Sequence, residues 1–492
     1  MPTRQRIKRR DFMKGSLAAG ASLVLASPFS SVRGANDDIR AAVVGINSRG
    51  GSHIGAFDKM EGVRLAGLCD VDRNVLEKRT KSFKDRDMKV DAYVDIRKLL
   101  ENKNIDVISI ATTNHWHSLA TIWACQAGKD VYVEKPCSHN IFEGRKCVEA
   151  AEKYKRIVQH GTQQRSSSGR TKEMAAIASG KYGKLLVSKA WASKNGKGRW
   201  GVGFKPTKEP PENLDFNIWL GPAKKQPYHE NIVHYNWHWF FDFGNGEIGN
   251  QGVHQMDIAR WAIPGGSLPR SVISMGGRWV KSTEGHPPFT DQANTPNCQL
   301  TVMDFGGPLL VFEVIGLVDA AGVDGKKYPK KVSNEFYLEE GVIKGGKFYP
   351  KGSDKGESLV DVDVEMGPGD IFENFIHCVR SRKREELHAD IAEGHPSAAC
   401  CHLGNLSYRL GEQVSGTTRP DVLDKHEEIA KSWDTIKQTV KGTLGYDVSK
   451  NTYCLGPMLE FDPEKEKFVK NRKANRLLTR RYREPFVVPE SV

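Results

Sequence analysis

Short apolar runs alternate with amphipathic stretches in the first third of the chain. The runs at residues 39–46, 63–69, 107–111 and 131–133 are of strand length and almost wholly apolar. Such runs are typical of parallel strands whose two faces are both covered. Because segments of helical character separate them, we expect a right-handed, doubly wound parallel sheet of the Rossmann type. Its ligand crevice should lie at the carboxyl ends of the strands.

Beyond residue 160 the strand-like runs follow one another with fewer intervening helices. They cover residues 185–191, 271–275, 299–305, 309–314 and 334–338. This pattern predicts a C-terminal α+β domain with a predominantly antiparallel sheet, one face on the core and the other free for a partner. Residues 393–411 carry small side chains at helical spacing, and the Gly- and Lys-rich residues 341–356 predict a loop or hairpin.

At 492 residues the chain is too long for one hydrophobic core. We predict four segments. Residues 1–35 form an export signal, residues 36–160 a Rossmann domain, residues 161–415 a substrate and oligomerisation domain, and residues 416–492 an extension that wraps the surface.

The first segment carries Arg9 and Arg10, then Phe12 and Lys14, ahead of a modest apolar stretch at 15–26. This order resembles a twin-arginine signal, which predicts export of the folded protein to the periplasm. The alternatives are a signal anchor or a basic first helix. The stretch is too short and too rich in Gly, Ala and Ser for a membrane span, and we expect none in the mature chain.

Charge and cysteine content change this picture little. The net charge is +13, but residues 1–35 hold seven basic residues and one Asp, so the remainder carries a modest excess. The basic cluster at 476–483 is interpreted as a solvated or interdomain surface, and no nucleic-acid partner is expected. Nine cysteines without paired spacing, including the adjacent Cys400 and Cys401, indicate free thiols.

The turn after the first strand reads Gly45-x-Asn47-x-Arg49-Gly50. Glycines at a helix N-terminus let the backbone approach a pyrophosphate, and Asn47 stands where a middle glycine is usual, as a residue that tolerates positive φ. Asp70 ends the second strand 25 residues after Gly45, where a carboxylate would accept hydrogen bonds from ribose hydroxyls. This arrangement favours NAD over NADP. The alternative is that Asp70 caps the next helix.

Four further motifs are informative when they are taken together. They are Ala111-Thr-Thr-Asn-His-Trp-His117, Glu134-Lys-Pro136, Gly161-Thr-Gln-Gln-Arg165 and Gly249-Asn-Gln-Gly-Val-His-Gln-Met-Asp257. Together they resemble the glucose–fructose oxidoreductase / inositol dehydrogenase (Gfo/Idh/MocA) family over residues 39 to about 415, with Thr113 in place of a usual Pro. The resemblance implies that the cofactor is contacted by Thr112, Asn114, His117, Glu134 and Lys135, besides the residues of the glycine turn.

The same resemblance implies a catalytic pair of Lys135 and His254. Lys135 would polarise the reacting oxygen beside the nicotinamide, and His254 would act as general base because it titrates near neutral pH. The family's usual Asp four residues before this His is Asn250 here. Asp257, at i+3 from His254, could supply the missing carboxylate or serve a structural role. Lys135 as a surface lysine and His254 as an ordinary helix histidine remain the alternatives.

Residues 229–242 crowd three histidines and five aromatic side chains into one segment. Trp237 and His238 suit a sugar pocket, which needs aromatic faces and hydrogen-bond donors, although an aromatic core segment would look similar. Arg165 either binds substrate or pairs structurally. The spacing of His229, His234 and His238 matches no strong zinc pattern, and no metal site is predicted.

Three functions remain open at this point. The first is an NAD-dependent oxidoreductase that acts on a secondary hydroxyl of a sugar or glycoside and keeps its cofactor tightly bound. The second is redox-neutral glycoside cleavage through a transient 3-keto intermediate. The third is a non-catalytic, cofactor-stabilised binding protein. The family resemblance implies a homo-oligomer, dimer or tetramer, whose other partner is a small sugar or glycoside.

Overall fold

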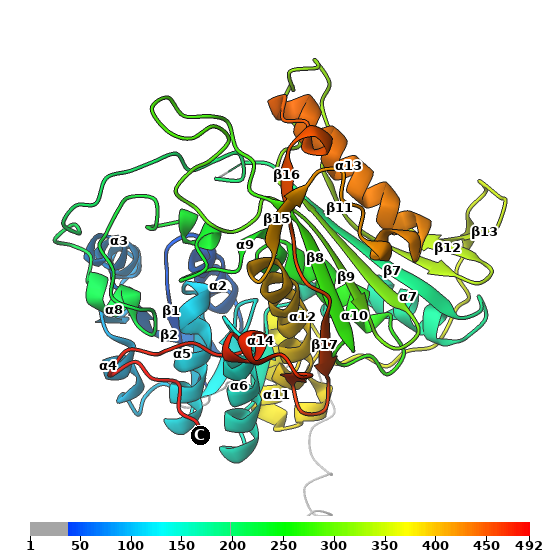
Figure 1. Cartoon of the computed structure of the whole chain (residues 1–492). Helices are drawn as coiled ribbons and strands as arrows, with labels where there is room; N and C mark the ends of the chain where they lie inside the picture. Colours follow the sequence, from blue (N-terminus) through cyan, green and yellow to red (C-terminus); the bar gives the residue numbers. More distant parts are fainter. Residues whose placement is uncertain (1–37, 197) are drawn as a thin grey trace, which may run out of the picture. The chain divides into compact units, whose positions relative to one another are not determined.

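Six parallel strands form the first sheet, in the order β3-β2-β1-β4-β5-β6 (Figure 1). The strands are β1 (Ile39–Val44), β2 (Val63–Cys69), β3 (Asp91–Tyr93), β4 (Val107–Ile110), β5 (Asp130–Val133) and β6 (Val158–His160). All four predicted strands are present, and the doubly wound Rossmann sheet is confirmed. The sheet is seen in a computed structural model that describes residues 38–196 and 198–492, of which residues 39–492 make one compact unit. The predicted export signal lies outside the described residues.

Helices cover both faces of this sheet, as buried apolar strands require. One face packs on α2 (Ser48–Asp58), α3 (Arg73–Lys84) and α11 (Ile371–Ser381), and the other on α4 (Ile96–Leu100), α5 (Asn114–Gln126) and α6 (Ile141–Lys153). Helix α11 comes from far along the chain and brings Phe372 onto Tyr132 of β5, with ring centroids 4.5 Å apart. The Rossmann core is therefore completed by the C-terminal half of the protein.

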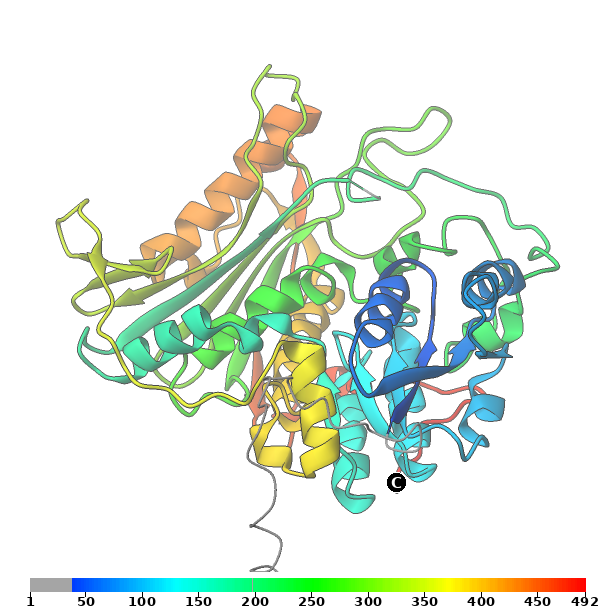
Figure 2. The same cartoon turned by 180° about the vertical axis from the view of Figure 1, so that it is seen from behind.

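The second sheet has twelve strands, and the order along its main path is β14-β13-β12-β11-β7-β10-β9-β8-β16-β15. Its strands are β7 (Leu185–Ser193), β8 (Ser271–Gly277), β9 (Cys298–Asp304), β10 (Leu309–Ile315), β11 (Lys331–Leu338), β12 (Gly341–Lys344), β13 (Lys347–Pro350), β14 (Glu357–Ser358), β15 (Glu412–Ser415), β16 (Thr452–Leu455), β17 (Leu459–Asp462) and β18 (Lys467–Phe468). Among the described strands of this second sheet, which Figure 2 shows from behind, only β7 and β10 pair in parallel, so the predominantly antiparallel sheet is confirmed.

Helices also cover both faces of the second sheet, and the expectation of a face left free is wrong. One face packs on α7 (Ser168–Ala178), α10 (Gly252–Trp261) and α12 (Ile391–Arg409), the last of which was predicted at 393–411. The other face buries Trp433, Ile436 and Val440 of α13 (Glu427–Leu444), which crosses the sheet in Figure 1. The helical period of 427–444 was missed at the sequence level because these residues were assigned to an irregular extension.

The last part of the chain returns to the Rossmann sheet. After β17 and β18 come α14 (Arg472–Arg476) and a segment that passes in front of α5 and α6 (Figure 1). Phe486, Val488 and Val492 are buried in the same apolar cluster as α5 and α6. All nine cysteines are free and buried, as predicted, with Cys400 and Cys401 inside α12.

A buried ion pair fixes α10 between the two sheets. Arg165, in the 3-10 turn η1 (Gln163–Ser166) that follows β6, donates from Nε to both carboxylate oxygens of Asp257, at 3.0 and 2.9 Å. Ser397 of α12 donates to the same carboxylate at 2.7 Å. The two charged groups are almost fully buried, so each depends on the other for compensation.

Replacing Asp257 by Asn should therefore lower the free energy of unfolding by about 3 kcal/mol, because Arg165 would lose its nearest carboxylate and keep only Glu393, at 3.5 Å, as a charged partner. The measurement is the urea midpoint of the purified protein. The double variant Arg165→Met with Asp257→Leu is the control and should recover much of the loss. A single variant as stable as the wild type would contradict this role for the pair.

Candidate functional site

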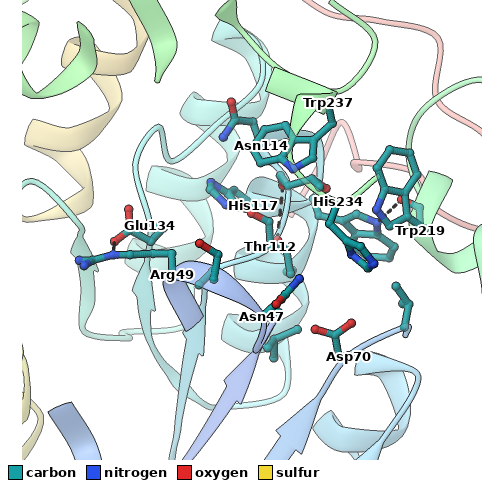
Figure 3. Close-up of a pocket in the computed structure, with 18 of the residues that line it drawn as sticks. Asn47, Arg49, Asp70, Thr112, Asn114, His117, Glu134, Trp219, His234 and Trp237 are labelled. Carbon is teal, nitrogen blue, oxygen red and sulfur yellow. Dashed lines mark hydrogen bonds and ion pairs between the residues drawn. The ribbon is translucent and has the colours of Figure 1, made fainter. Parts of the chain in front are cut away.

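A cavity of about 300 Å³ lies at the carboxyl ends of β1, β2, β4 and β5 (Figure 3). This is the position predicted for a ligand crevice in a doubly wound sheet. Segments from the second half of the chain close it, including α8 (Phe216–Leu220) and the 3-10 turn η2 (Asn236–Trp239). Twelve of the sequence-predicted site residues line it: Gly45, Asn47, Arg49, Asp70, Thr112, Asn114, His117, Glu134, Lys135, Trp237, His238 and Asn250.

The glycine turn forms the floor of this cavity. Gly45 has φ +78°, and a Cβ there would lie 2.8 Å from the Ala111 carbonyl oxygen. A Cβ on Gly50 would lie 1.8 Å from the carbonyl oxygen of Gly45, so neither position accepts a side chain. Asn47 has φ −72°, and the expectation that it needs positive φ is wrong. Asn47 instead stands at the N-cap of α2, where its side chain makes no capping bond and borders the cavity.

Asp70 holds the end of β2 against this turn. Its carboxylate accepts hydrogen bonds from the backbone N–H groups of Ile46 and Asp72, both at 3.0 Å. Burial raises the pKa of Asp70 in spite of these two donors. The helix cap is Asp72, which accepts from Asn74 and Val75, so Asp70 is not committed to α3. Its position at the cavity wall matches the one predicted for a ribose-binding acid.

Glu134 is the most heavily engaged carboxylate of the cavity. Its Oε1 accepts from Arg49 Nε at 2.6 Å and lies 3.2 Å from His53 Nε2, and its Oε2 accepts from the Lys135 N–H at 3.1 Å. Burial works against ionisation, but His53, Arg49 and Lys135 together hold the pKa of Glu134 well below its usual value. His53 belongs to this group and was not predicted, because nothing in the sequence places α2 beside β5.

Lys135 brings an ammonium into the interior of the cavity. Its Nζ donates to the backbone oxygen of Asn250 at 2.9 Å and lies 3.5 Å from the Asn250 side-chain oxygen. Burial lowers the pKa of Lys135, while the carboxylates of Glu134 and Glu247 oppose this shift. Lys135 follows β5 of the Rossmann sheet, and Asn250 lies between α9 (Gly246–Gly249) and α10, which packs on the second sheet. This contact therefore links the Rossmann sheet to the helices of the second sheet.

Glu247 lies next to the site and was not predicted from the sequence. Its Oε2 accepts from the Asn250 side-chain amide at 3.3 Å and lies 2.7 Å from Arg199 Nη2, whose guanidinium lies over the Trp239 ring. Burial raises the pKa of Glu247, and Arg199 and Asn250 oppose the rise. Glu247 precedes Asn250 by three residues, on the short helix α9 that ends at Asn250. This spacing is the sequence signal that could have identified Glu247.

The loop after β4 and the first turn of α5 line the opposite wall. His117 is buried, and its Nδ1 lies 2.6 Å from the Pro136 carbonyl oxygen, which joins this loop to the lysine turn. Burial lowers the pKa of His117, so the neutral ring donates from Nδ1. The Oδ1 of Asn114 is buried without a hydrogen-bond partner among the described residues. A buried acceptor of this kind on a cavity wall is available to a ligand.

His254, Asp257 and Arg165 do not share this cavity wall. The two oxygens of Asp257 are taken up by Arg165 and Ser397, so this carboxylate is not available to orient His254. Arg165 is buried in that ion pair and not directed at the cavity. Burial and the charge of Lys135 lower the pKa of His254 to about 3, so the ring is neutral near pH 7.

Aromatic side chains form the roof, as Figure 3 shows for Trp237, His234 and Trp219. The ring of Trp237 stacks on that of His238 with centroids 3.6 Å apart. His238 donates from Nδ1 to the Tyr235 carbonyl oxygen at 2.6 Å, and burial lowers its pKa to about 3. His234 lies 3.1 Å from the Asp72 carboxylate. Within residues 38–196 and 198–492, no group of three or more His, Cys, Asp or Glu side chains is arranged to hold a metal ion.

Sequence comparison with known proteins gives matches to the domain models of one family and to individual curated relatives. Residues 39–162 match the model of the Gfo/Idh/MocA oxidoreductase family described as an NAD-binding Rossmann fold, and residues 180–267 match that family's C-terminal alpha/beta domain. A curated relative, glycosyl hydrolase family 109 protein 2 of Shewanella sp. (strain ANA-3), is 29% identical over 167 residues. That match covers 29% of this chain and only 37% of the relative.

Solved structures share the fold at low identity. The WlbA dehydrogenase of Bordetella pertussis, in complex with NADH and UDP-GlcNAcA, is 17% identical with a TM-score of 0.53, covering 76% of this chain and 97% of that one. The aldose-aldose oxidoreductase of Caulobacter crescentus, complexed with glycerol, is 14% identical with a TM-score of 0.51, covering 75% and 98%. Residues 39–162 thus match the NAD-binding Rossmann domain of the Gfo/Idh/MocA oxidoreductase family, and residues 180–267 match its C-terminal alpha/beta domain.

Proposed function

We propose that this protein is an NAD-dependent oxidoreductase that acts on a secondary hydroxyl of a sugar or glycoside and keeps its cofactor tightly bound. One observation carries the proposal. The ammonium of the half-buried Lys135 lies in the same cavity as a glycine turn and an aromatic roof. The ammonium suits a reacting oxygen, the glycine turn suits a pyrophosphate, and the aromatic roof suits the C–H face of a sugar ring.

The residues present fit NAD. Gly45 and Gly50 keep this turn tight, because a Cβ at either position would collide with backbone atoms, and α2 begins beside the turn, so its N-terminal N–H groups can face a pyrophosphate. Asp70 offers a carboxylate to ribose hydroxyls and would repel a 2′-phosphate, which favours NAD over NADP. Asn114 presents an unpaired buried oxygen. When bound, NAD supplies the acceptor for the hydride.

The chain's own residues then divide the work at the reacting oxygen. Lys135 can leave its bond to Asn250 and donate to the substrate hydroxyl, and its charge stabilises negative charge on that oxygen. Asn250 and Glu247 hold the ammonium in place, so Glu247 is a positioning residue. His254 does not line the cavity, and its pKa of about 3 overturns the expectation that it titrates near neutral pH, so its role as general base rests on the family resemblance alone. Arg165 and Asp257 maintain the position of α10 and do not contact the substrate.

A sugar or glycoside substrate is supported from two directions. Trp237, His238 and Tyr235 line one side of the cavity with aromatic faces and polar edges. The proteins similar to this chain include one complexed with UDP-GlcNAcA, one described as an aldose-aldose oxidoreductase and one described as a glycosyl hydrolase. On these two grounds we propose a carbohydrate substrate for this chain.

The glycosyl hydrolase match also favours a second candidate, redox-neutral glycoside cleavage. In that reaction the hydroxyl at C3 is oxidised transiently, which acidifies the C2 proton. Elimination expels the leaving group, water adds and the C3 carbonyl is reduced again, so no net NADH forms. The same Lys135 would bind the C3 oxygen, and a neutral His254 would accept the C2 proton.

We also propose export by the twin-arginine route, on the order Arg9, Arg10, Phe12 and Lys14 ahead of residues 15–26. A cofactor held during export of a folded protein would suit a compartment without a free NAD pool. The described residues contain no helix long and apolar enough to span a membrane. Substituting both arginines by Lys should leave the protein in the cytoplasmic fraction, and unchanged fractionation would oppose this proposal.

Substituting Lys135 by Met should reduce turnover at least about a hundredfold while NAD stays bound, because the ammonium serves the reacting oxygen and not the cofactor's affinity. The assay offers a panel of glycosides in deuterated water and follows NADH, released sugar and deuterium at C2. Net NADH indicates oxidation, and deuterium with released sugar indicates redox-neutral cleavage.

Exposed Lys103→Met is the matched control and should retain full activity. Turnover that survives both Lys135→Met and His254→Ala would contradict both enzymatic proposals and favour a binding protein.

Two substitutions beside Lys135 should move the alkaline limb of the pH–rate profile in opposite directions. Glu247→Gln removes a negative charge that raises the pKa of Lys135, so the ammonium deprotonates at lower pH. Asn250→Asp adds a negative charge next to Nζ, so deprotonation needs a higher pH. The measurement is kcat against pH from 6 to 10 with saturating substrate. Shifts in the same direction, or none, would contradict the positioning role of Glu247.

A further inference from the structure

A second cavity of about 830 Å³ lies on the other side of the lysine turn and shares no lining residue with the first. Its walls come from the start of α6, the C-terminal half of α12, residues 224–225 and 241–245, and the segment 476–484. Figure 1 shows α14, where this last segment begins, lying across α6 beside α12. The basic cluster that we interpreted as a solvated or interdomain surface therefore lines a cavity.

The lining of this cavity is strongly cationic. Seven basic side chains face two carboxylates, those of Asp242 and Glu484. The basic residues are Lys224, Lys225, Arg409, Arg476, Arg480, Arg481 and Arg483. Lys224 pairs with Asp242 at 3.3 Å, whereas no ion pair among the described residues involves any of the five arginines. Five guanidinium groups without a carboxylate partner leave this cavity with uncompensated positive charge.

Three of these arginines are oriented by the fold. Arg483 donates to the oxygens of Asn217 and Gly221, and the other two are Arg480 and Arg409. Arg480 donates from Nη1 to the Asp242 carbonyl oxygen at 2.9 Å and to His139 Nδ1 at 3.1 Å. Arg409, on the last turn of α12, lies with its guanidinium 5.0 Å from the centre of the Phe241 ring. Burial and the nearby charge of Arg480 lower the pKa of Arg409, and Asp242 opposes the shift.

Three buried polar side chains on the same lining have atoms without partners. Because His139 accepts at Nδ1 from Arg480, its neutral ring carries the proton at Nε2, and this buried donor is unpaired. Asn245 and Asn405 use their amide groups on backbone oxygens and leave both Oδ1 atoms unpaired. Buried polar groups are rarely left without partners. A ligand that fits this cavity should therefore accept hydrogen bonds from the arginines and donate hydrogen bonds to the two asparagine oxygens.

We propose that this cavity binds a phosphate or sulfate monoester carried on a hydroxylated molecule such as a sugar. The arginine forks and His139 Nε2 match the oxygens of a tetrahedral oxyanion, which accepts several hydrogen bonds at once. The oxygens of Asn245 and Asn405 match hydroxyl donors of the carrier. The volume exceeds what an inorganic ion would fill. This is a binding function separate from the chemistry at Lys135.

The test is calorimetric titration of the whole protein with glucose 6-phosphate, glucose 6-sulfate, glucose and inorganic phosphate. We expect both esters to bind, glucose to show no binding, and inorganic phosphate to bind at least tenfold more weakly than the phosphate ester. Arg480→Gln and Arg409→Gln should each weaken ester binding at least tenfold. Exposed Arg481→Gln, which leaves the oriented arginines intact, should weaken it less and guards against variants that fail to fold.

Arg64→Gln, an exposed change of equal charge on β2, is the control and should bind as the wild type does. Absence of binding by both esters would overturn the proposal, as would equal losses in Arg64→Gln and Arg480→Gln. Inorganic phosphate that binds as tightly as the ester would overturn the assignment of a hydroxylated carrier. Because the readout is binding, these results are independent of whether the Lys135 site is catalytic.

Discussion

The site depends on one buried carboxylate, that of Glu134, which stays ionised where burial alone would neutralise it. Arg49, His53 and the backbone of Lys135 compensate its charge through direct contacts. That charge, together with Glu247, in turn helps to keep the half-buried Lys135 protonated, since burial lowers its pKa. An isolated ion in a protein interior costs several kcal/mol, so the carboxylates beside Lys135 and the cation beside Glu134 make both charges tolerable.

Residues that pack on the second sheet complete the contacts around Lys135, which belongs to the Rossmann domain. Lys135 leaves β5 and meets Asn250, which α9 and α10 present from the second sheet, and Glu247 and Arg199 extend the chain of contacts. Interactions made in the C-terminal half thus set the electrostatics of a residue in the N-terminal half. Residue 250 is an Asn, and the carboxylate that acts on Lys135 from this side is that of Glu247, one contact away.

Local patterns in the sequence were enough to predict the two sheets and the glycine turn, because apolar period and close backbone approach are local properties, whereas the lysine turn was inferred from the family resemblance of its motif. Partnerships across the fold were not predictable in this way. Asp257 was a candidate support for His254, but the path of η1 brings Arg165 to it instead. His53 and Glu247 reach the site only through the packing of α2 and α9. The helix α13 was missed, although its period was present, because residues after 416 were treated as an extension.

The most direct test of this account is the ionisation of Lys135 itself. Reductive methylation of the protein over a range of pH, with Lys135 quantified in its peptide by mass spectrometry, gives the pKa of the amine. The account predicts a midpoint below the ordinary 10.5 in the wild type and a lower one still in Glu134→Gln, which removes the opposing carboxylate. A wild-type midpoint at or above 10.5, unchanged by Glu134→Gln, would contradict it.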